Sequence, residues 1–296
     1  MTDRALTLHH GDSTLTFCPH IGASIAQYTW RGIDILRPAS PAALRDGLVR
    51  QMAYYPLVPY SNRIGQAMLL AGGQAWRLRA NAPPEPHALH GIGWQRAWQV
   101  ASHTSDTAQM QLLHAADADW PFAFDARETI RLDGDMLQLQ LALRNTDTRP
   151  MPAGLGFHPY FPAGPQTRLQ ADWRQMWQAG ADALPTALAA RPAESDFSSL
   201  RPVAGWRVDN CFTGWNGHAM LDYPSHQVHL TADDACRHLV CFAPDDGRPF
   251  IALEPVSHVN NAFALAARGV PGTGSRMLAP GESMEISMSL RVVGVD

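Results

Sequence analysis

The sequence has no long apolar run. It contains no uninterrupted apolar stretch of 18 or more residues, which is about the length that a membrane-spanning helix needs. The first residues, MTDRALTLHHGDSTLTF, also lack the apolar stretch that follows the positive end of a secretory signal. We therefore expect a cytoplasmic protein that makes no contact with a membrane.

Cysteines are few, and their spacing is irregular. The four cysteines form no Cys-x-x-Cys pair and no half of a zinc site, so we expect buried thiols. A His-x-x-His pair at 87–90 and a Cys-Arg-His run at 236–238 resemble fragments of metal sites, but no third ligand is nearby. The sequence therefore predicts no metal. The cysteines are Cys18, Cys211, Cys236 and Cys241.

Charge is also scarce. Charged residues make up 17% of the chain, the formal net charge is -4, and no basic cluster stands out. A nucleic-acid interface needs Lys and Arg gathered on one face, so nucleic acid is excluded as a partner. The glycine-rich pieces at 71–73 and 269–274 lack the Lys of a phosphate loop and the helix that follows a dinucleotide fingerprint. A small neutral ligand and no cofactor fit this composition, which leaves the oligomeric state open.

Helix signals are few, and the commonest hydrophobic period is two. In 135–144 four leucines alternate with Gln and Ala, and 286–292, 227–231 and 108–114 repeat the pattern. Turn signals such as Asp133-Gly134 separate these stretches. Only 41–46 and 259–267 suggest short helices.

Proline and glycine do not mark a domain boundary. The 23 prolines and 23 glycines are spread along the chain, and no internal repeat is evident. All-β sandwiches often exceed 200 residues in one domain. We therefore predict one all-β domain over residues 1–296, a large antiparallel β-sandwich with few short helices.

Five short segments combine polar residues with aromatic residues, Gly or Pro, which is typical of loops and strand ends that line a cleft. Taken together, in this order and over nearly the whole chain, they resemble the aldose 1-epimerase, or galactose mutarotase, family. The segments are Tyr-Ser-Asn-Arg-Ile-Gly at 60–65, Leu-His-Gly-Ile-Gly-Trp at 89–94, Gly-Phe-His-Pro-Tyr-Phe at 156–161, Val-Asp-Asn-Cys-Phe at 208–212 and Leu-Glu-Pro-Val-Ser-His at 253–258.

This resemblance implies a role for each matching residue. His158 would be the general acid that protonates the ring oxygen of a pyranose, and Glu254 the general base that takes the proton of the anomeric hydroxyl. His90 would hydrogen-bond near the ring oxygen. The Asn62-Arg63 pair and Asp209 would hold sugar hydroxyls. The resemblance also implies a galactose mutarotase-like supersandwich fold.

The chemistry agrees with these residue types. Interconverting α and β anomers requires one proton delivered to the ring oxygen and one removed from the C1 hydroxyl, which a His and a carboxylate can do near neutral pH. Each positioned group typically contributes roughly a hundred- to ten-thousand-fold. An aromatic ring can stack on the sugar, and the candidates beside the motifs are Trp94, Tyr160, Phe212 and Trp215.

Other interpretations remain open at this point. His158 could be a hydrogen-bonded core residue, Glu254 could pair with an Arg, and Arg63 with Asp209 could form a simple salt bridge. The substrate could be a phosphorylated or otherwise anionic sugar, although few Arg residues surround the turn at 90–91, which favours a neutral aldose. A sugar-binding protein without turnover would keep the cleft but would not need both His158 and Glu254.

Overall fold

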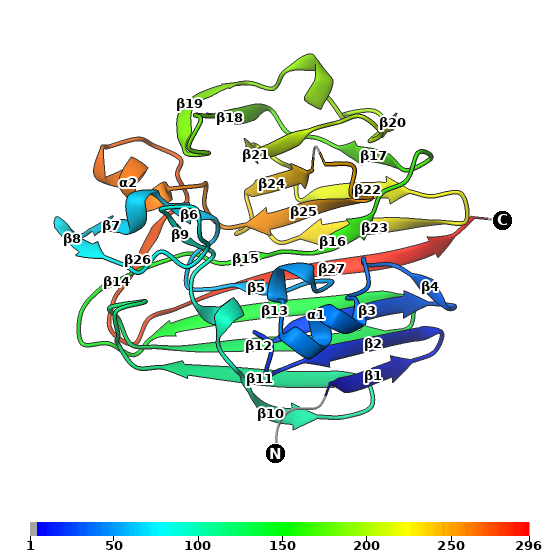
Figure 1. The fold of residues 1–296 in the computed structure, drawn as a ribbon, viewed down its shortest axis with the longest axis horizontal. Coiled ribbons are helices and arrows are strands. Elements are labelled where there is room, and N and C mark those ends of the chain that lie inside the picture. Colours follow the sequence, from blue (N-terminus) through cyan, green and yellow to red (C-terminus); the bar gives the residue numbers. More distant parts are fainter. Residues whose placement is uncertain (1–4, 245, 296) are drawn as a thin grey trace.

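The computed structural model describes residues 5–244 and 246–295, and two large antiparallel sheets dominate it (Figure 1). The first has nine strands and includes the longest ones, with β27 running across the middle of the view in red. In sheet order its strands are β10 (Gln99–His103), β11 (Thr107–His114), β12 (Phe124–Asp133), β13 (Met136–Asn145), β27 (Ser283–Gly294), β23 (His226–Ala232), β22 (His218–Asp222), β17 (Arg168–Ala171) and β20 (Arg201–Pro202).

The second large sheet carries the residues that the motifs single out. Seven of its strands form one path, and β16 pairs with β25 off this path. In sheet order the strands are β19 (Pro185–Ala190), β18 (Gln175–Ala179), β21 (Val208–Thr213), β24 (His238–Ala243), β25 (Phe250–Val256), β15 (Gly156–Phe157) and β5 (Pro56–Leu57), with β16 at Tyr160–Pro162.

Smaller elements cover the edges and the outer face of these sheets (Figure 1). No helix in the described part of the chain is long and apolar enough to cross a membrane. One small sheet has four strands, in the order β1 (Leu6–His10), β2 (Ser13–Cys18), β3 (Ser24–Trp30) and β4 (Ile33–Asp34). The others are two-stranded and consist of β6 (Arg63–Ile64) with β9 (Ala88–Leu89), β7 (Met68–Ala71) with β8 (Gln74–Arg77), and β14 (Met151–Ala153) with β26 (Arg276–Leu278). The helices are α1 (Pro41–Asp46), α2 (Ala262–Ala267) and the 3-10 turns η1 (Val49–Gln51), η2 (Gly65–Ala67), η3 (Gly93–Gln95) and η4 (Ala193–Ser195).

The period-two pattern explains the nine-stranded sheet. Along β13 the leucines at 137, 139, 141 and 143 are buried, and they lie opposite the buried alternate residues of β12 and β27. The predicted strands and the all-β antiparallel sandwich are therefore confirmed. The expected helix at 41–46 is confirmed, with the Ser40 hydroxyl accepting a hydrogen bond from the Ala43 N–H. The helix expected at 259–267 is shorter, because α2 begins only at Ala262, after Asn261 in the left-handed region.

Both faces of the eight-stranded sheet are covered. Every residue of β25 is buried, unlike the alternating strands of the other sheet. Leu253 belongs to the main core between the two large sheets, whereas its neighbours in sequence, Ala252 and Glu254, lie on the opposite face. That outer face has a second apolar cluster, which includes Tyr55, Trp94 and Tyr160. The candidate site lies within this second cluster. All four cysteines are free and buried, which confirms the expectation of buried thiols.

Candidate active site

The strand pairing of β25 brings His158 and Glu254 together. Tyr160 pairs with Ala252, and Gly156 pairs with Val256, so His158 lies in the gap between β15 and β16 opposite Glu254. The His158 Nε2 atom is 3.2 Å from the Glu254 Oε1 atom. Only 4% of His158 and 2% of Glu254 are exposed. The two residues predicted from the sequence as acid and base are therefore in direct contact, although they are almost a hundred positions apart.

Two tyrosine rings hold the His158 imidazole in place. Tyr160 stacks on it with ring centroids 4.5 Å apart, and the Tyr55 ring lies 4.6 Å away. The Tyr160 hydroxyl is 3.4 Å from His158 Nε2 and 3.3 Å from the Tyr55 hydroxyl. The backbone N–H of His158 donates to the Tyr55 carbonyl. These contacts fix the position and orientation of the His158 ring.

Burial sets the protonation of the pair. Burial, with a smaller contribution from the nearby positive charge of Arg37, lowers the pKa of His158 to about 3. Burial also raises the pKa of Glu254 well above its ordinary value, and the negative charge of Asp209 adds to this shift. Because the two groups touch, they titrate as one unit. The site therefore favours a neutral imidazole beside a carboxyl group that keeps its proton.

His90 and Asn62 face each other at the ends of two paired strands. Arg63 of β6 pairs with Leu89 of β9, and the chain then turns at His90 with a φ of 59° and at Asn62 with a φ of 58°. The Asn62 N–H donates to His90 Nδ1, and the His90 N–H donates to the Asn62 carbonyl. With Nδ1 as the acceptor, a neutral His90 carries its proton on Nε2.

Burial also determines the protonation of His90. Burial is the main cause that lowers the pKa of His90 well below its ordinary value, and the charges of His158, Arg63 and Arg50 add to it. The imidazole is therefore neutral near pH 7, with an N–H on Nε2. Its ring centroid is 5.3 Å from that of His158. A neutral donor beside the acid–base pair suits a hydrogen bond to an uncharged oxygen.

Arg63 lies at the rim of this group and pairs with two carboxylates. Its Nε atom is 2.8 Å from Glu85 Oε2, and its Nη2 atom is 3.4 Å from Asp209 Oδ2. The Asn62 side chain accepts from both the backbone N–H and the Nη1 atom of Arg63. The salt bridge between Arg63 and Asp209 that the sequence left open is present. It also connects these residues to Glu254, because the charges of Asp209 and Arg63 both act on the Glu254 pKa.

Several buried polar atoms around the pair have no hydrogen-bond partner in the described part of the chain. They include the second oxygen of Glu254 and the Nδ1 atom of His158. The Ser61 hydroxyl, next to Asn62, and the Asn260 side-chain oxygen share this property. Leaving such groups unpaired costs about 1–3 kcal/mol each, a cost that polar groups of a ligand can remove. The arrangement therefore suits a ligand that is rich in hydroxyls.

The four aromatic candidates separate into two groups. Phe212 and Trp215 belong to the main core between the sheets. Trp94 and Tyr160 belong to the outer cluster around His158, and Trp94 also lines the neighbouring pocket. The Trp94 indole N–H donates to the carbonyls of Leu89 and Gly91, which fixes the ring to the turn that carries His90. Because His158 stacks on the Tyr160 ring and the Arg37 guanidinium also lies over it, Trp94 is the better candidate to stack on a sugar.

Sequence reasoning missed three residues that organise the site. Tyr55 holds His158, Glu85 neutralises Arg63, and Arg37 lies over the outer face of Tyr160 at 3.9 Å from the ring centroid. Glu85 was detectable in principle, because it stands alone among prolines in Pro83-Pro84-Glu85-Pro86, directly before the His90 segment. Tyr55 and Arg37 lie outside every polar segment, so the local sequence carries no such signal for them.

Comparison with known proteins shows the family to which this chain belongs. The family model described as aldose 1-epimerase matches residues 4–291. The uncharacterized protein YphB of Escherichia coli K12 is 32% identical over 302 residues, covering 97% of this chain and 98% of its own. The chain therefore belongs to the aldose 1-epimerase family.

Solved structures share the whole architecture. One from Escherichia coli K12 superposes with a TM-score of 0.89 at 29% identity, over 99% of both chains. A galactose mutarotase-like protein from Clostridium acetobutylicum superposes with a TM-score of 0.85 at 18% identity, over 98% of this chain and 95% of its own. At 18% identity the second comparison shows the fold alone. This fold agrees with the supersandwich predicted from the sequence.

Proposed function

We propose that this protein is a mutarotase that interconverts the α and β anomers of an aldose by opening and reclosing its ring. The observation that carries this proposal is the buried contact of 3.2 Å between His158 Nε2 and Glu254 Oε1. A core histidine with only a structural role would not need a buried carboxyl group beside it, since burying an ionisable group is costly. Family membership supports the same class of reaction.

The proposed reaction moves two protons. Glu254 takes the proton of the C1 hydroxyl, the C1–O1 bond becomes a carbonyl, and the C1–O5 bond breaks with its electron pair on O5. His158 gives its proton to O5, so the product is the open aldehyde. Rotation about the C1–C2 bond presents the other face of the carbonyl. The reverse proton transfers then close the ring as the other anomer.

One proton, shared by the pair, is sufficient for this cycle. Ring opening starts from imidazolium and carboxylate and ends with neutral imidazole and carboxylic acid, which is the form that burial favours at rest. Sugar hydroxyls that donate to Glu254 favour the carboxylate form and so prepare the pair for opening. The contact between the two side chains allows the proton to return without solvent. No metal or cofactor is needed for any of these steps.

The remaining residues are assigned to binding. The Nε2–H of His90 donates near the ring oxygen, Asp209 accepts from sugar hydroxyls, and Arg63 and Asn62 hold the rim of the site. The segment directly around His90 contains few Arg residues, so this segment by itself supplies no binding group for an anion. A cytoplasmic location remains a prediction from the sequence.

The test is anomer-resolved proton NMR, or polarimetry, on freshly dissolved α-anomers of galactose, glucose, L-arabinose, D-xylose and L-fucose. The proposal predicts faster approach to the equilibrium mixture for at least one aldose when the protein is present. The ranking gives the preferred hydroxyl stereochemistry. Binding of sugars without acceleration of any of them, neutral or anionic, would favour a sugar-binding protein and contradict the proposal.

A further inference from the structure

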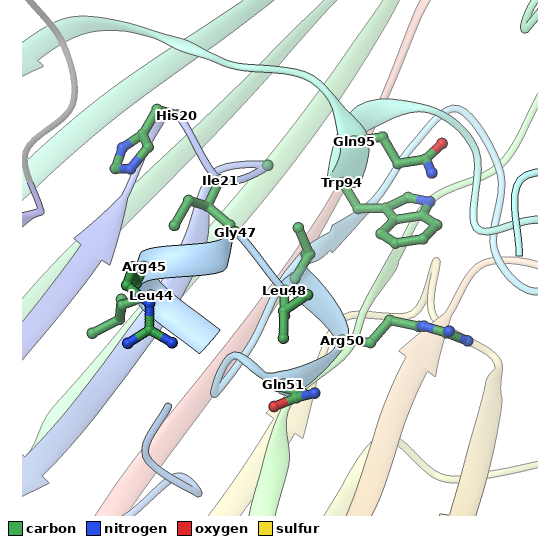
Figure 2. Close-up of a pocket in the computed structure, with 12 residues that line it drawn as sticks. His20, Ile21, Leu44, Arg45, Gly47, Leu48, Arg50, Gln51, Trp94 and Gln95 are labelled. Atoms are coloured by element: carbon green, nitrogen blue, oxygen red, sulfur yellow. The ribbon is translucent and has the colours of Figure 1, made fainter. Parts of the chain in front are cut away.

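A pocket of about 790 Å³ opens between α1, η1 and η3 (Figure 2). His158 and Glu254 do not line it, but Trp94, which belongs to the cluster around His158, does. The 3-10 turn η1 supplies Arg50 and Gln51 to its wall. Figure 2 shows the Arg50 side chain extending away from Arg45, on the same side of the pocket as Trp94. The pocket therefore adjoins the aromatic cluster around His158 through Trp94, and Arg50 lies on that side of it.

Arg50 differs from the other arginines near the site in its lack of a partner. Within residues 5–244 and 246–295, its side chain makes no ion pair and no hydrogen bond, and the residue is exposed. Arg63 is held by Glu85 and Asp209, and Arg45, on the far wall, pairs with Asp46 at 3.0 Å. An anionic ligand can therefore reach Arg50 without displacing a carboxylate of the protein.

The backbone of Arg50 is tied to the catalytic histidine. The Arg37 guanidinium donates to the carbonyls of Arg50 and Met52, at 3.3 and 2.7 Å. The same guanidinium lies over the Tyr160 ring, which in turn stacks on His158. The turn that carries Arg50 is thereby fixed relative to the reacting atoms. A rigid support of this kind is what a specificity residue requires.

The charge of Arg50 also acts within the site. Burial raises the pKa of Tyr160 to about 12, and the positive charge of Arg50 partly opposes this rise. The same charge contributes to the low pKa of His90, after burial and the charges of His158 and Arg63. Arg50 is therefore within electrostatic range of residues on both sides of the catalytic pair.

We propose that Arg50 is a specificity-determining residue that binds an anionic group, a carboxylate or a phosphate, on the aldose substrate. This inference rests on the mutarotase function proposed above and deepens it. The anion lies on a sugar carbon remote from C1, so that C1 and O5 stay beside His158 and Glu254. A guanidinium offers two parallel N–H donors to either anion, which gives both charge and geometry. Neutral aldoses remain substrates, and anionic aldoses are preferred.

The experiment compares matched neutral and anionic sugars. Mutarotation of D-glucose, D-glucuronate and D-glucose 6-phosphate is followed by anomer-resolved NMR for the natural protein, Arg50→Met and Arg45→Met. We expect the ratio of kcat/KM for the anionic sugar over glucose to fall about tenfold in Arg50→Met, mainly through KM. Arg45→Met keeps the ratio, since Arg45 lines the same pocket but is paired. The two anionic sugars distinguish a carboxylate from a phosphate as the preferred group.

Other outcomes separate the two proposals. Two results would overturn the role of Arg50 and leave the mutarotase function standing. One is that the protein accelerates the mutarotation of glucose and prefers neither anionic sugar. The other is that Arg50→Met lowers kcat/KM equally for the neutral and the anionic sugars. An equal fall of the kcat/KM ratio in Arg45→Met would show that any positive charge at this surface has the same effect. That result would also overturn the specific role of Arg50. Absence of acceleration for all sugars would instead contradict the mutarotase function itself.

Discussion

Glu128 is a second buried carboxyl group, on the opposite side of the second large sheet from His158 and Glu254. It lies on β12, faces the main core, and accepts a hydrogen bond from the Tyr54 hydroxyl. Tyr54 is the neighbour of Tyr55, which holds His158. Burial raises the pKa of Glu128 to about 8, although the Tyr54 hydrogen bond opposes the shift. The folded protein therefore holds a proton here that the unfolded chain releases above about pH 4.5.

This linkage predicts how stability depends on pH. Because the folded state binds the extra proton, the contribution of Glu128 is fully present below about pH 4.5 and is lost as pH rises to about 8. The slope reaches about 1.4 kcal/mol per pH unit. Glu128→Gln keeps an acceptor for Tyr54 and removes this slope, as urea unfolding at several pH values would measure. An unchanged slope in Glu128→Gln, equal to that of the exposed control Glu285→Gln, would contradict the assignment.

Single residues were predictable where a motif carries them and not elsewhere. His158, Glu254, His90, Arg63 and Asp209 all lie in short polar segments, and the structure brings them together. Their roles remain predictions. Arg37 and Tyr55 act through stacking across elements that are distant in sequence, and no local pattern encodes such contacts.

At the scale of elements, the turn that carries His90 depends on one glycine. Gly91 has a φ of 71°, and a Cβ atom there would lie 2.1 Å from the Val58 carbonyl oxygen. That oxygen accepts hydrogen bonds from the N–H groups of Ile92 and Gly93. The close approach of these two backbone segments fixes His90 against Asn62.

We therefore predict that Gly91→Ala costs both stability and activity. The free energy of unfolding should fall by about 3 kcal/mol, the sum of positive-φ strain and overpacking, and mutarotation should fall with it. Gly32→Ala is the matched control, because Gly32 has a φ of 75° with no atom within 4 Å of the added carbon. It should cost only about 1 kcal/mol. Equal losses in the two variants, measured by urea unfolding, would show that the close approach to Val58 does not matter.

Long strands were predictable because their alternation is repeated many times, as in β13 and β27. The elements that carry the site are different. β6, β9 and β15 have two residues each, which is too short for a period to be read. Their positions depend on pairing with partners distant in sequence, such as Gly156 with Val256. The start of the helix expected at 259–267 was likewise decided by the backbone at Asn261.

At the scale of the whole molecule, the site lies on the outer face of the eight-stranded sheet and not between the two sheets. The sequence partly indicates this arrangement, because Phe250-Ile251-Ala252-Leu253 is apolar without alternation. A strand of this kind is buried on both faces. One face of β25 then stabilises the sandwich, while the other supplies Glu254 to the site. Which loops cover the outer face could not be read from a pattern.

The most direct test of this account is the turnover and sugar binding of Glu254→Gln. The variant keeps the shape of the side chain and removes its ability to exchange a proton, so we expect mutarotation to fall at least about a hundredfold while sugar binding by calorimetry changes little. Glu194→Gln, at an exposed glutamate of η4, is the control and should behave as the natural protein. Turnover of Glu254→Gln at the rate of the natural protein would contradict the acid–base mechanism.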